Sequence, residues 1–321
     1  SFTEVRAVPC ARTFSRQRTS RHTGRIRRGA LQRLQERVKI MFDIRYKNEY
    51  GCITFGGSDA DIRSLKVEGL GNPTADYKTI EFADGNGVVT VGRRDLPRTI
   101  TLSADIRNDA DGHVRRRMNR ILHADGSLYC IFDTQRRRIE CKVIQPPEFV
   151  KVGAGIYSFA VQWQADYPYF TDWYDTTVQL FSIKPLLTTK TVLPSAFSKR
   201  ISRATIDVGG DLNIYPVLKI INTNTASDTT GTVTITNHST GAFIKLNHVL
   251  ADGEIVTTDI KHRRIESSVH GDITDKISDD TVLANFFLQV GLNDLEFINT
   301  SIGQELNATA TYNNEYFSAE V

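Results

Sequence analysis

The sequence lacks the features that mark several large classes of protein. It has four cysteines in 321 residues, Cys10, Cys52, Cys130 and Cys141, and no C-x-x-C pair, so it does not encode a disulfide framework. We expect free thiols, with Cys130 and Cys141 as small core residues because both continue apolar alternations. No stretch approaches 18 consecutive apolar residues, so we expect no membrane span.

Catalytic signatures are also missing. The chain contains no G-x-S-x-G, H-E-x-x-H, P-loop or strand-to-helix G-x-G-x-x-G motif. The seven histidines are scattered, and His113 and His123 lie too far apart along one helix to share a metal ion. The only tryptophans, Trp163 and Trp173, bracket a domain junction and do not form a sugar-stacking cleft. We therefore expect no enzymatic activity, no catalytic residue, no cofactor and no metal.

The net charge of +3 hides a split along the chain. Residues 1–40 hold 11 basic and two acidic side chains, whereas residues 41–321 hold 29 basic and 35 acidic ones. Like-charge blocks of this kind are usually disordered. We expect residues 1–40 to be a basic, disordered extension with one short helix near Leu31–Val38, and the functional protein to start at Met41. A basic arm that contacts nucleic acid is the alternative.

Residues 41–172 predict a β-rich domain with one helix. The helix follows a capping segment, Asn108–Asp111, and ends at Asp125-Gly126; Val114, Met118, Ile121 and Leu122 form its apolar stripe. Alternating patterns predict strands at Ile62–Leu70, Tyr77–Ala83, Val88–Val91, Arg98–Ile106, Leu128–Phe132, Arg138–Ile144 and Gly155–Gln164.

The second half predicts a β-sandwich without helices. Residues 173–203 are irregular and contain Pro185 and Pro194, so we expect a linker there. Residues 204–321 predict short strands separated by turns rich in Asn, Asp, Gly and Thr. These strands are Ala204–Val208, Val217–Ile221, Gly231–Asn237, Ala242–Leu246, Glu254–Asp259, His262–Ser267, Asn285–Val290, Asp294–Asn299 and Ala308–Tyr312.

Two arginine clusters are the strongest polar features of the first domain. They consist of Arg115, Arg116, Arg117 and Arg120 on the helix, and of Arg136, Arg137 and Arg138 near a hairpin turn. Such runs are commonly solvated surface. The functional interpretation is an electrostatic rim that contacts a partner subunit or faces DNA passing through an assembly.

The order of these features resembles the distal tail proteins of long, non-contractile-tailed bacteriophages. The resemblance runs from about Met41 to the C-terminus and lies in the order of several segments, not in one motif. These segments are Arg98–Leu102, Arg116–Leu122, Gly126–Tyr129, Phe159–Phe170, Val208–Asp211, Tyr215–Ile220, Ile235–Phe243, Leu250–Glu254 and Gln289–Asn293. The best markers are the junction Asp166–Phe170 and the pair Thr240-Gly241 and Asp252–Glu254.

The resemblance implies a tail-tube-like barrel domain that forms a hexameric ring, followed by a galectin-like sandwich. The protein would be a structural adaptor of the virion tail or baseplate, assembled in the host cytoplasm. Its implied partners are the tail-tube protein, the tail-tip hub and a receptor-binding protein, with DNA only as passing cargo. The sandwich does not show the clustered His, Asn, Arg and Trp of a galactoside site.

The expected contact residues are the two arginine clusters and, at the domain junction, Trp163, Tyr167, Pro168, Tyr169, Phe170 and Trp173. Two other functions remain open from sequence. One is a carbohydrate-binding or cell-wall-degrading tail module, and the other is nucleic-acid binding through the basic arm.

Overall fold

The computed structural model describes residues 42–56, 61–81, 86–132, 134–185, 198–223, 231–300 and 306–319. The extension and short helix expected within residues 1–40, and Cys10, lie outside these ranges. Contacts divide the chain into two units, the first ending at Phe170 and the second spanning Thr171–Phe317. The chain returns to the first unit at Ser318, where the Ala319 N–H donates a hydrogen bond to the Leu70 carbonyl oxygen at 3.0 Å.

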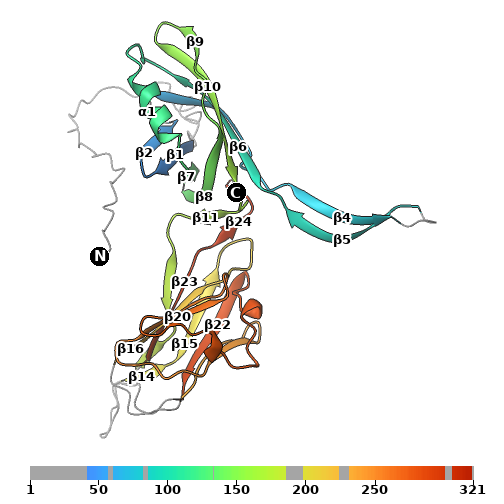
Figure 1. Ribbon diagram of the computed structural model, residues 1–321, viewed down its shortest axis with the longest axis vertical. Coiled ribbons are helices and arrows are strands. Elements are labelled where there is room, and N and C mark those ends of the chain that lie inside the picture. The colour runs from blue at the N-terminus through green and yellow to red at the C-terminus, as the bar shows by residue number, and fades with distance from the viewer. Residues whose placement is uncertain are drawn as a thin grey trace, which may run out of the picture. The chain divides into compact units, whose positions relative to one another are not determined.

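The first unit is built on one antiparallel sheet with the order β2-β1-β7-β8-β10-β6-β3, and β9 extends β10 at its edge (Figure 1). The strands are β1 (Phe42–Asn48), β2 (Gly51–Phe55), β3 (Ile62–Glu68), β6 (Arg98–Ile106), β7 (Gly126–Phe132), β8 (Gln135–Gln145), β9 (Val150–Gly153) and β10 (Ile156–Ala165). The fold is therefore mainly β in this half, as the alternating sequence patterns predict.

One face of this sheet forms the core of the unit. Along β6, every second side chain from Arg98 to Ile106 is buried, which is the period of a strand with one covered face. On β10, the buried Trp163 packs against Tyr46 and Phe55, with ring centroids 5.7 and 5.8 Å away. Cys130 and Cys141 are buried free thiols, as expected. Burial raises the pKa of the Cys141 thiol to about 12, so it stays protonated at neutral pH.

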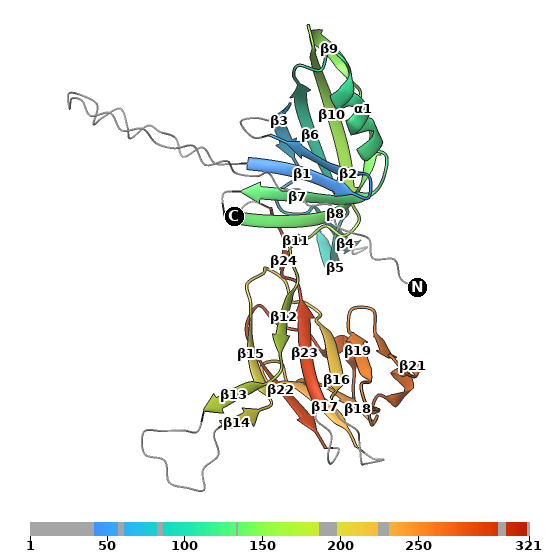
Figure 2. The same cartoon turned by 90° about the vertical axis from the view of Figure 1, so that its left-hand side faces the viewer.

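Among the described residues of the first unit there is one α-helix, α1 (His113–Ile121), which lies beside the sheet (Figure 2). Its apolar stripe buries Met118 and Ile121, and the following residue, Leu122, is also buried. The stripe has the spacing of one helix face; Arg116 and Arg120 lie on the opposite face, and Arg115 and Arg117 lie at the margins of the stripe. The predicted helix and its ending before Gly126 are thus confirmed.

A long hairpin stands apart from the sheet within the first unit. It consists of β4 (Ala75–Glu81) and β5 (Val88–Asp95), which pair with each other and form a separate two-stranded sheet. In Figure 1 it projects away from β6 and β3. Nearly all of its side chains are exposed, on both faces.

The second unit is a pair of antiparallel sheets, with the orders β12-β23-β16-β19-β20-β21 and β15-β22-β17-β18 (Figure 2). The first sheet contains β12 (Thr176–Gln179), β16 (Val217–Asn222), β19 (Ile255–Asp259), β20 (Arg264–Ser267), β21 (Gly271–Asp272) and β23 (Leu306–Tyr312). The second contains β15 (Arg203–Val208), β17 (Val233–Asn237), β18 (Ala242–Leu246) and β22 (Gly291–Asn299). Shorter pairs are β11 (Phe170–Asp172) with β24 (Glu315–Tyr316), and β13 (Ser182–Pro185) with β14 (Ser198–Ile201).

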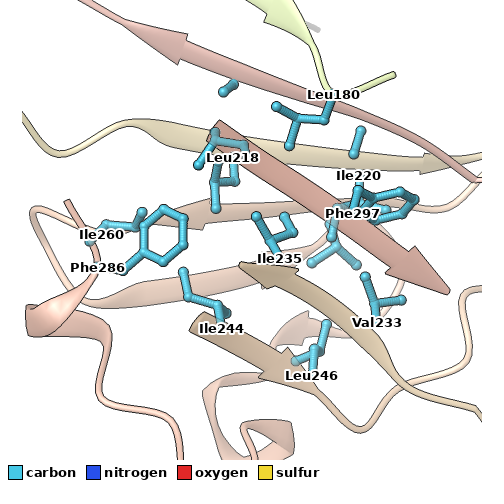
Figure 3. Packing of buried hydrophobic residues seen from close by; sticks show 14 of the residues in the cluster. Leu180, Leu218, Ile220, Val233, Ile235, Ile244, Leu246, Ile260, Phe286 and Phe297 are labelled. Atoms are coloured by element: carbon cyan, nitrogen blue, oxygen red, sulfur yellow. The ribbon is translucent and has the colours of Figure 1, made fainter. Parts of the chain in front are cut away.

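The core of the second unit lies between these two sheets (Figure 3). Inward side chains of β16, such as Leu218 and Ile220, belong to the same buried cluster as Ile235 of β17 and Phe297 of β22. Burying one such side chain contributes about 1.5–3 kcal/mol relative to exposing it. The sandwich therefore closes its own core within the residues that the structure describes.

The structure corrects two sequence expectations in this unit. Residues 285–290, expected as a strand, begin at the last residue of a 3₁₀ turn, η3 (Leu283–Asn285), and pair only through one isolated bridge between Ile214 and Leu288. Phe286 and Leu288 are buried, so their alternation reflects burial without a strand ladder. A second 3₁₀ turn, η2 (Thr274–Lys276), was not expected either.

The segment expected as an irregular linker also contains strands. Within residues 173–203, β12 pairs with β23 and so belongs to the six-stranded sheet, and β13 pairs with β14. The four-residue strand β12 has only Val178 partly buried, so its sequence carries almost no alternation signal.

Candidate functional site

The helix that carries the first arginine cluster is fixed by one buried carboxylate. Asp109 is fully buried, and its Oδ1 accepts a hydrogen bond from the Val114 N–H at 2.8 Å. Its Oδ2 accepts from the Arg115 N–H at 3.3 Å and from Arg115 Nε at 2.8 Å. Gly112, at the N-cap with a φ of 74°, provides no side-chain cap, so Asp109 caps the helix from three residues upstream.

The pKa of Asp109 reflects this arrangement. Burial opposes ionisation of the carboxyl, but the hydrogen bonds from the Arg115 side chain and from the Val114 and Arg115 backbone outweigh it. The pKa of Asp109 therefore lies below its ordinary value. An ionised carboxylate at this end of the helix also complements the helix dipole.

Arg115, expected as a subunit or lumen contact, is engaged within its own chain. Besides the ion pair with Asp109, its guanidinium lies 3.8 Å from the ring centroid of Tyr157 on β10. The Asp109 N–H also donates to the Gly155 carbonyl oxygen at 3.1 Å. Arg115 thus ties the helix to the β9–β10 hairpin, and it presents less of its charge to a partner than its neighbours do.

The other helix arginines line an open depression of about 540 Å³. Arg117 Nη2 donates to the Cys52 carbonyl oxygen at 2.8 Å, and Arg116 Nη2 donates to the Asp111 carbonyl oxygen at 3.1 Å. Both side chains, and Arg120, are exposed. The lining residues are Tyr50, Gly51, Cys52, His113, Arg116, Arg117, Arg120 and Ile121. The surface is basic and suits an acidic group of another protein.

The second arginine cluster lies on β8 beside the tight turn between β7 and β8. Arg136 and Arg138 share the strand face opposite to Ile139 and Cys141, whereas Arg137 lies on the same face as those buried residues. Arg136 is exposed, and the other two arginines are partly buried. The two clusters therefore sit on different elements, and the depression beside α1 is not lined by the β8 arginines.

The junction segment is held by Arg98, whose role sequence reasoning missed. Arg98 is 5% exposed; its Nε donates to the Pro168 carbonyl oxygen at 2.8 Å, and its Nη1 donates to the carbonyl oxygens of Gly69, at 2.9 Å, and Gly71. Its guanidinium lies 4.7 Å from the ring centroid of Phe170. Burial lowers the pKa of Arg98 to about 10. The signal available in the sequence was that Arg98 continues the alternation of Ile100 and Leu102, which places it on their face of the strand.

The aromatic residues expected at the junction occupy different environments. Tyr169 donates a hydrogen bond from its hydroxyl to Asp95 Oδ2 at 2.6 Å and packs edge-on against the exposed Tyr167, with ring centroids 5.1 Å apart. Phe170 is fully buried. Trp163 lies in the core of the first unit, and Trp173 is partly buried in the second unit.

The β4–β5 hairpin carries apolar side chains on both of its exposed faces. The strand register places Ile80 opposite Val89 on one face, and the alternation of β4 places Tyr77 on the other, with Val88. Tyr77 is 56% exposed and Ile80 is 53% exposed. Sequence reasoning predicted both strands but gave no sign that they stand apart from the sheet.

Comparison with known proteins gives a match in the second unit. Residues 209–316 match the family model of the siphovirus-type tail component, C-terminal domain. No curated protein matches the sequence. No helix among the described residues is long and apolar enough to cross a membrane.

The fold is similar to that of solved phage proteins. The crystal structure of SPP1 Dit (gp 19.1), described as a paradigm of the hub adsorption apparatus in phages that infect Gram-positive hosts, aligns with a TM-score of 0.57 and 13% identity. The alignment covers 85% of this chain and 98% of that one. Chains of the phage P2 baseplate in its activated conformation, with Ca or Sr, align less well, with TM-scores of 0.44 and 0.45, identities of 11% and 10%, and coverage of 84% of this chain and 97% of theirs. Residues 209–316 thus match the siphovirus-type tail component, C-terminal domain, and the fold over most of the chain is similar to that of the SPP1 Dit protein.

Proposed function

We propose that this chain is a hexameric adaptor of a phage tail, which joins the tail tube to the tail tip and the host-adhesion apparatus. The family match in the second unit and the fold that it shares with the SPP1 Dit protein support this proposal. Under this proposal the protein is a structural component and not an enzyme. Subunits close a ring, the ring stacks between the tail-tube protein and the tail-tip hub, and the lumen passes DNA as cargo.

The observation that carries the proposal is the β4–β5 hairpin. An isolated two-stranded hairpin is marginally stable in water, and this one exposes apolar side chains on both faces. A second copy of the same chain is the proposed occupant of those faces. In a closed ring every subunit offers one hairpin and receives one, so no apolar surface is left uncovered.

The two arginine clusters have separate roles under this proposal. The exposed Arg116, Arg117 and Arg120 would contact an acidic surface of a neighbouring subunit or stacked ring, because they border an open basic depression. Arg136 and Arg138 would contact a neighbouring subunit or line the lumen. The second unit would project from the ring and meet a receptor-binding protein, and the mature protein would reside in the virion tail.

Native mass measurement and negative-stain imaging of the chain test this proposal. We expect particles of six copies with a central opening, and stacked particles after addition of the tail-tube protein of the same phage. A protein that stays monomeric at high concentration and forms no ring with the tail-tube protein would contradict the adaptor function.

A further inference from the structure

Three potential metal ligands from two loops converge at one edge of the second unit. Among the described residues, His248, Glu254 and His270 each place a ligand atom within 4.8 Å of the other two. His248 Nε2 lies 2.8 Å from Glu254 Oε1, and the two imidazole rings meet edge-on with centroids 5.5 Å apart. His270 immediately precedes β21, the outermost strand of the six-stranded sheet (Figure 2).

The carboxylate of this cluster is buried and held in position. Glu254 is fully buried, and its Oε2 accepts a hydrogen bond from the Ala251 N–H at 2.6 Å. Its Oε1 accepts a hydrogen bond from the Ser267 hydroxyl. These donors orient the carboxylate, so that Oε1 lies toward His248. A buried carboxylate needs polar partners, and the His248 ring is the side chain that faces Oε1 together with Ser267.

The two histidines are positioned by the same network. The Ser267 hydroxyl oxygen accepts hydrogen bonds from the Val269 N–H at 3.1 Å and from the His270 N–H at 3.0 Å, which fixes the turn that carries His270. On the other side, Asn222 Nδ2 donates to the Leu250 and Ala251 carbonyl oxygens, both at 3.0 Å, and holds the segment after His248. The backbone segments that carry both histidines are thus held in place by hydrogen bonds within the chain.

We propose that His248, Glu254 and His270 bind one divalent transition-metal ion of the zinc class. Two imidazole nitrogens and one carboxylate oxygen are a typical zinc ligand set, whereas calcium and magnesium take oxygen ligands. With metal–ligand bonds of about 2.0–2.2 Å, tetrahedral ligand atoms lie roughly 3.4 Å apart. The ion would replace the hydrogen bond between His248 and Glu254, the exposed His270 would turn inward, and water would take the fourth position.

Binding would cross-link two loops of the sandwich. One is the segment from His248 to Glu254, and the other is the turn from Ser268 to His270, which joins β20 to the edge strand β21. A ligand that binds only the folded state stabilises it by mass action. Zinc would therefore stiffen the sheet edge, and this effect does not depend on ring assembly.

Metal titration of the untagged full chain, stripped with a chelator that is then removed, tests the proposal. We expect saturable binding of one Zn²⁺ per chain by calorimetry, a higher Tm with zinc, and a visible absorption band on adding Co²⁺. His270→Ala should weaken binding by at least about tenfold, with little effect on the metal-free protein because His270 is exposed. His270→Cys, which keeps a ligand atom, should restore binding.

A matched control lies in the same unit. His238 Nε2 lies 2.8 Å from Glu296 Oε2, a histidine–glutamate pair of the same length that belongs to no three-ligand group among the described residues. His238→Ala should leave zinc affinity unchanged. The proposal is wrong if zinc binds the wild type no more tightly than His270→Ala, or if His238→Ala weakens binding equally.

Discussion

The sandwich and the β4–β5 hairpin differ in the exposure of their apolar side chains. In the sandwich, inward residues of both sheets bury one another, and the core closes within one unit. In the hairpin, Tyr77, Ile80, Val88 and Val89 are all more than two-fifths exposed. The first region buries its apolar side chains within one subunit, whereas the second leaves apolar side chains exposed that a partner can cover.

Because of this difference, substitutions in the two regions should affect different properties, the stability of the subunit and its association with other copies. Substitutions in the core of the sandwich, or of Arg98, which holds the junction segment, should lower the free energy of unfolding, because they remove contacts that exist within one subunit. Substitutions of the exposed apolar hairpin residues should leave the subunit intact and act on its association. The following predictions run from the largest effect on stability to the smallest.

The largest loss is expected from Phe286→Ala. Phe286 is fully buried between the sheets of the second unit, and truncating a buried Phe removes about 3–5 kcal/mol of unfolding free energy. Urea denaturation of the dissociated subunit, followed by circular dichroism, measures this. Leu292→Ala is the control, since Leu292 is 65% exposed and its truncation should change stability by less than about 0.5 kcal/mol. Equal effects would contradict the placement of the core.

Arg98→Met should cause the next largest loss of unfolding free energy. Methionine keeps an apolar stem but leaves the carbonyl oxygens of Pro168, Gly69 and Gly71 without this donor, with a loss of about 1.5–3 kcal/mol. Arg94→Met on the hairpin removes an exposed ion pair to Asp76 and should lose about 0–1 kcal/mol. If Arg98→Met lowers the free energy of unfolding no more than Arg94→Met does, Arg98 does not stabilise the junction segment.

The helix cap should be sensitive to acid. Because the folded-state pKa of Asp109 lies below the unfolded value, its contribution is present above the ordinary pKa of about 4 and is lost as pH falls from there through the folded-state pKa. Asp109→Asn should reduce stability by about 1–2 kcal/mol at pH 7. The difference in stability between the variant and the wild type should shrink as pH falls below about 4. Chemical denaturation at several pH values checks this, and a gap independent of pH would contradict it.

The smallest effect on stability is expected from the double substitution Ile80→Thr and Val89→Thr. Both side chains are exposed, and threonine keeps a strong β propensity, so the free energy of unfolding of the isolated subunit should change by less than about 0.5 kcal/mol. Denaturation under dissociating conditions measures it. A loss above 2 kcal/mol would mean that these residues pack within their own subunit.

Much of the fold follows from alternation in the sequence. Strands with one covered face, such as Arg98–Ile106 and Ala242–Leu246, are predicted with the bounds that the structure shows. Some of the missed strands are short and weakly patterned, as in Val150–Gly153 and Thr176–Gln179, where no side chain is fully buried. The strand predicted at residues 285–290 is wrong for the opposite reason: side-chain burial alternates there, but the segment forms only one isolated bridge and no strand ladder.

The candidate sites were harder to predict because they depend on long-range contacts. The charge run on the helix is visible in the sequence, but nothing there indicates that Arg115 pairs with Asp109 and stacks on Tyr157. His248 and His270 are separated by 21 intervening residues and meet only because β19 and β20 pair. The hairpin strands are visible, but their separation from the sheet is a property of tertiary structure.

The central claim is that the hairpin makes the contacts that close the ring. Sedimentation velocity over a range of concentrations, applied to the wild type and to the Ile80→Thr, Val89→Thr variant, tests it most directly. Leu292→Thr removes an apolar strand residue of the second unit that is even more exposed, and it serves as the control. The account predicts a six-copy species for the wild type and Leu292→Thr, and monomers for the hairpin variant. A hairpin variant that assembles like the wild type would contradict it.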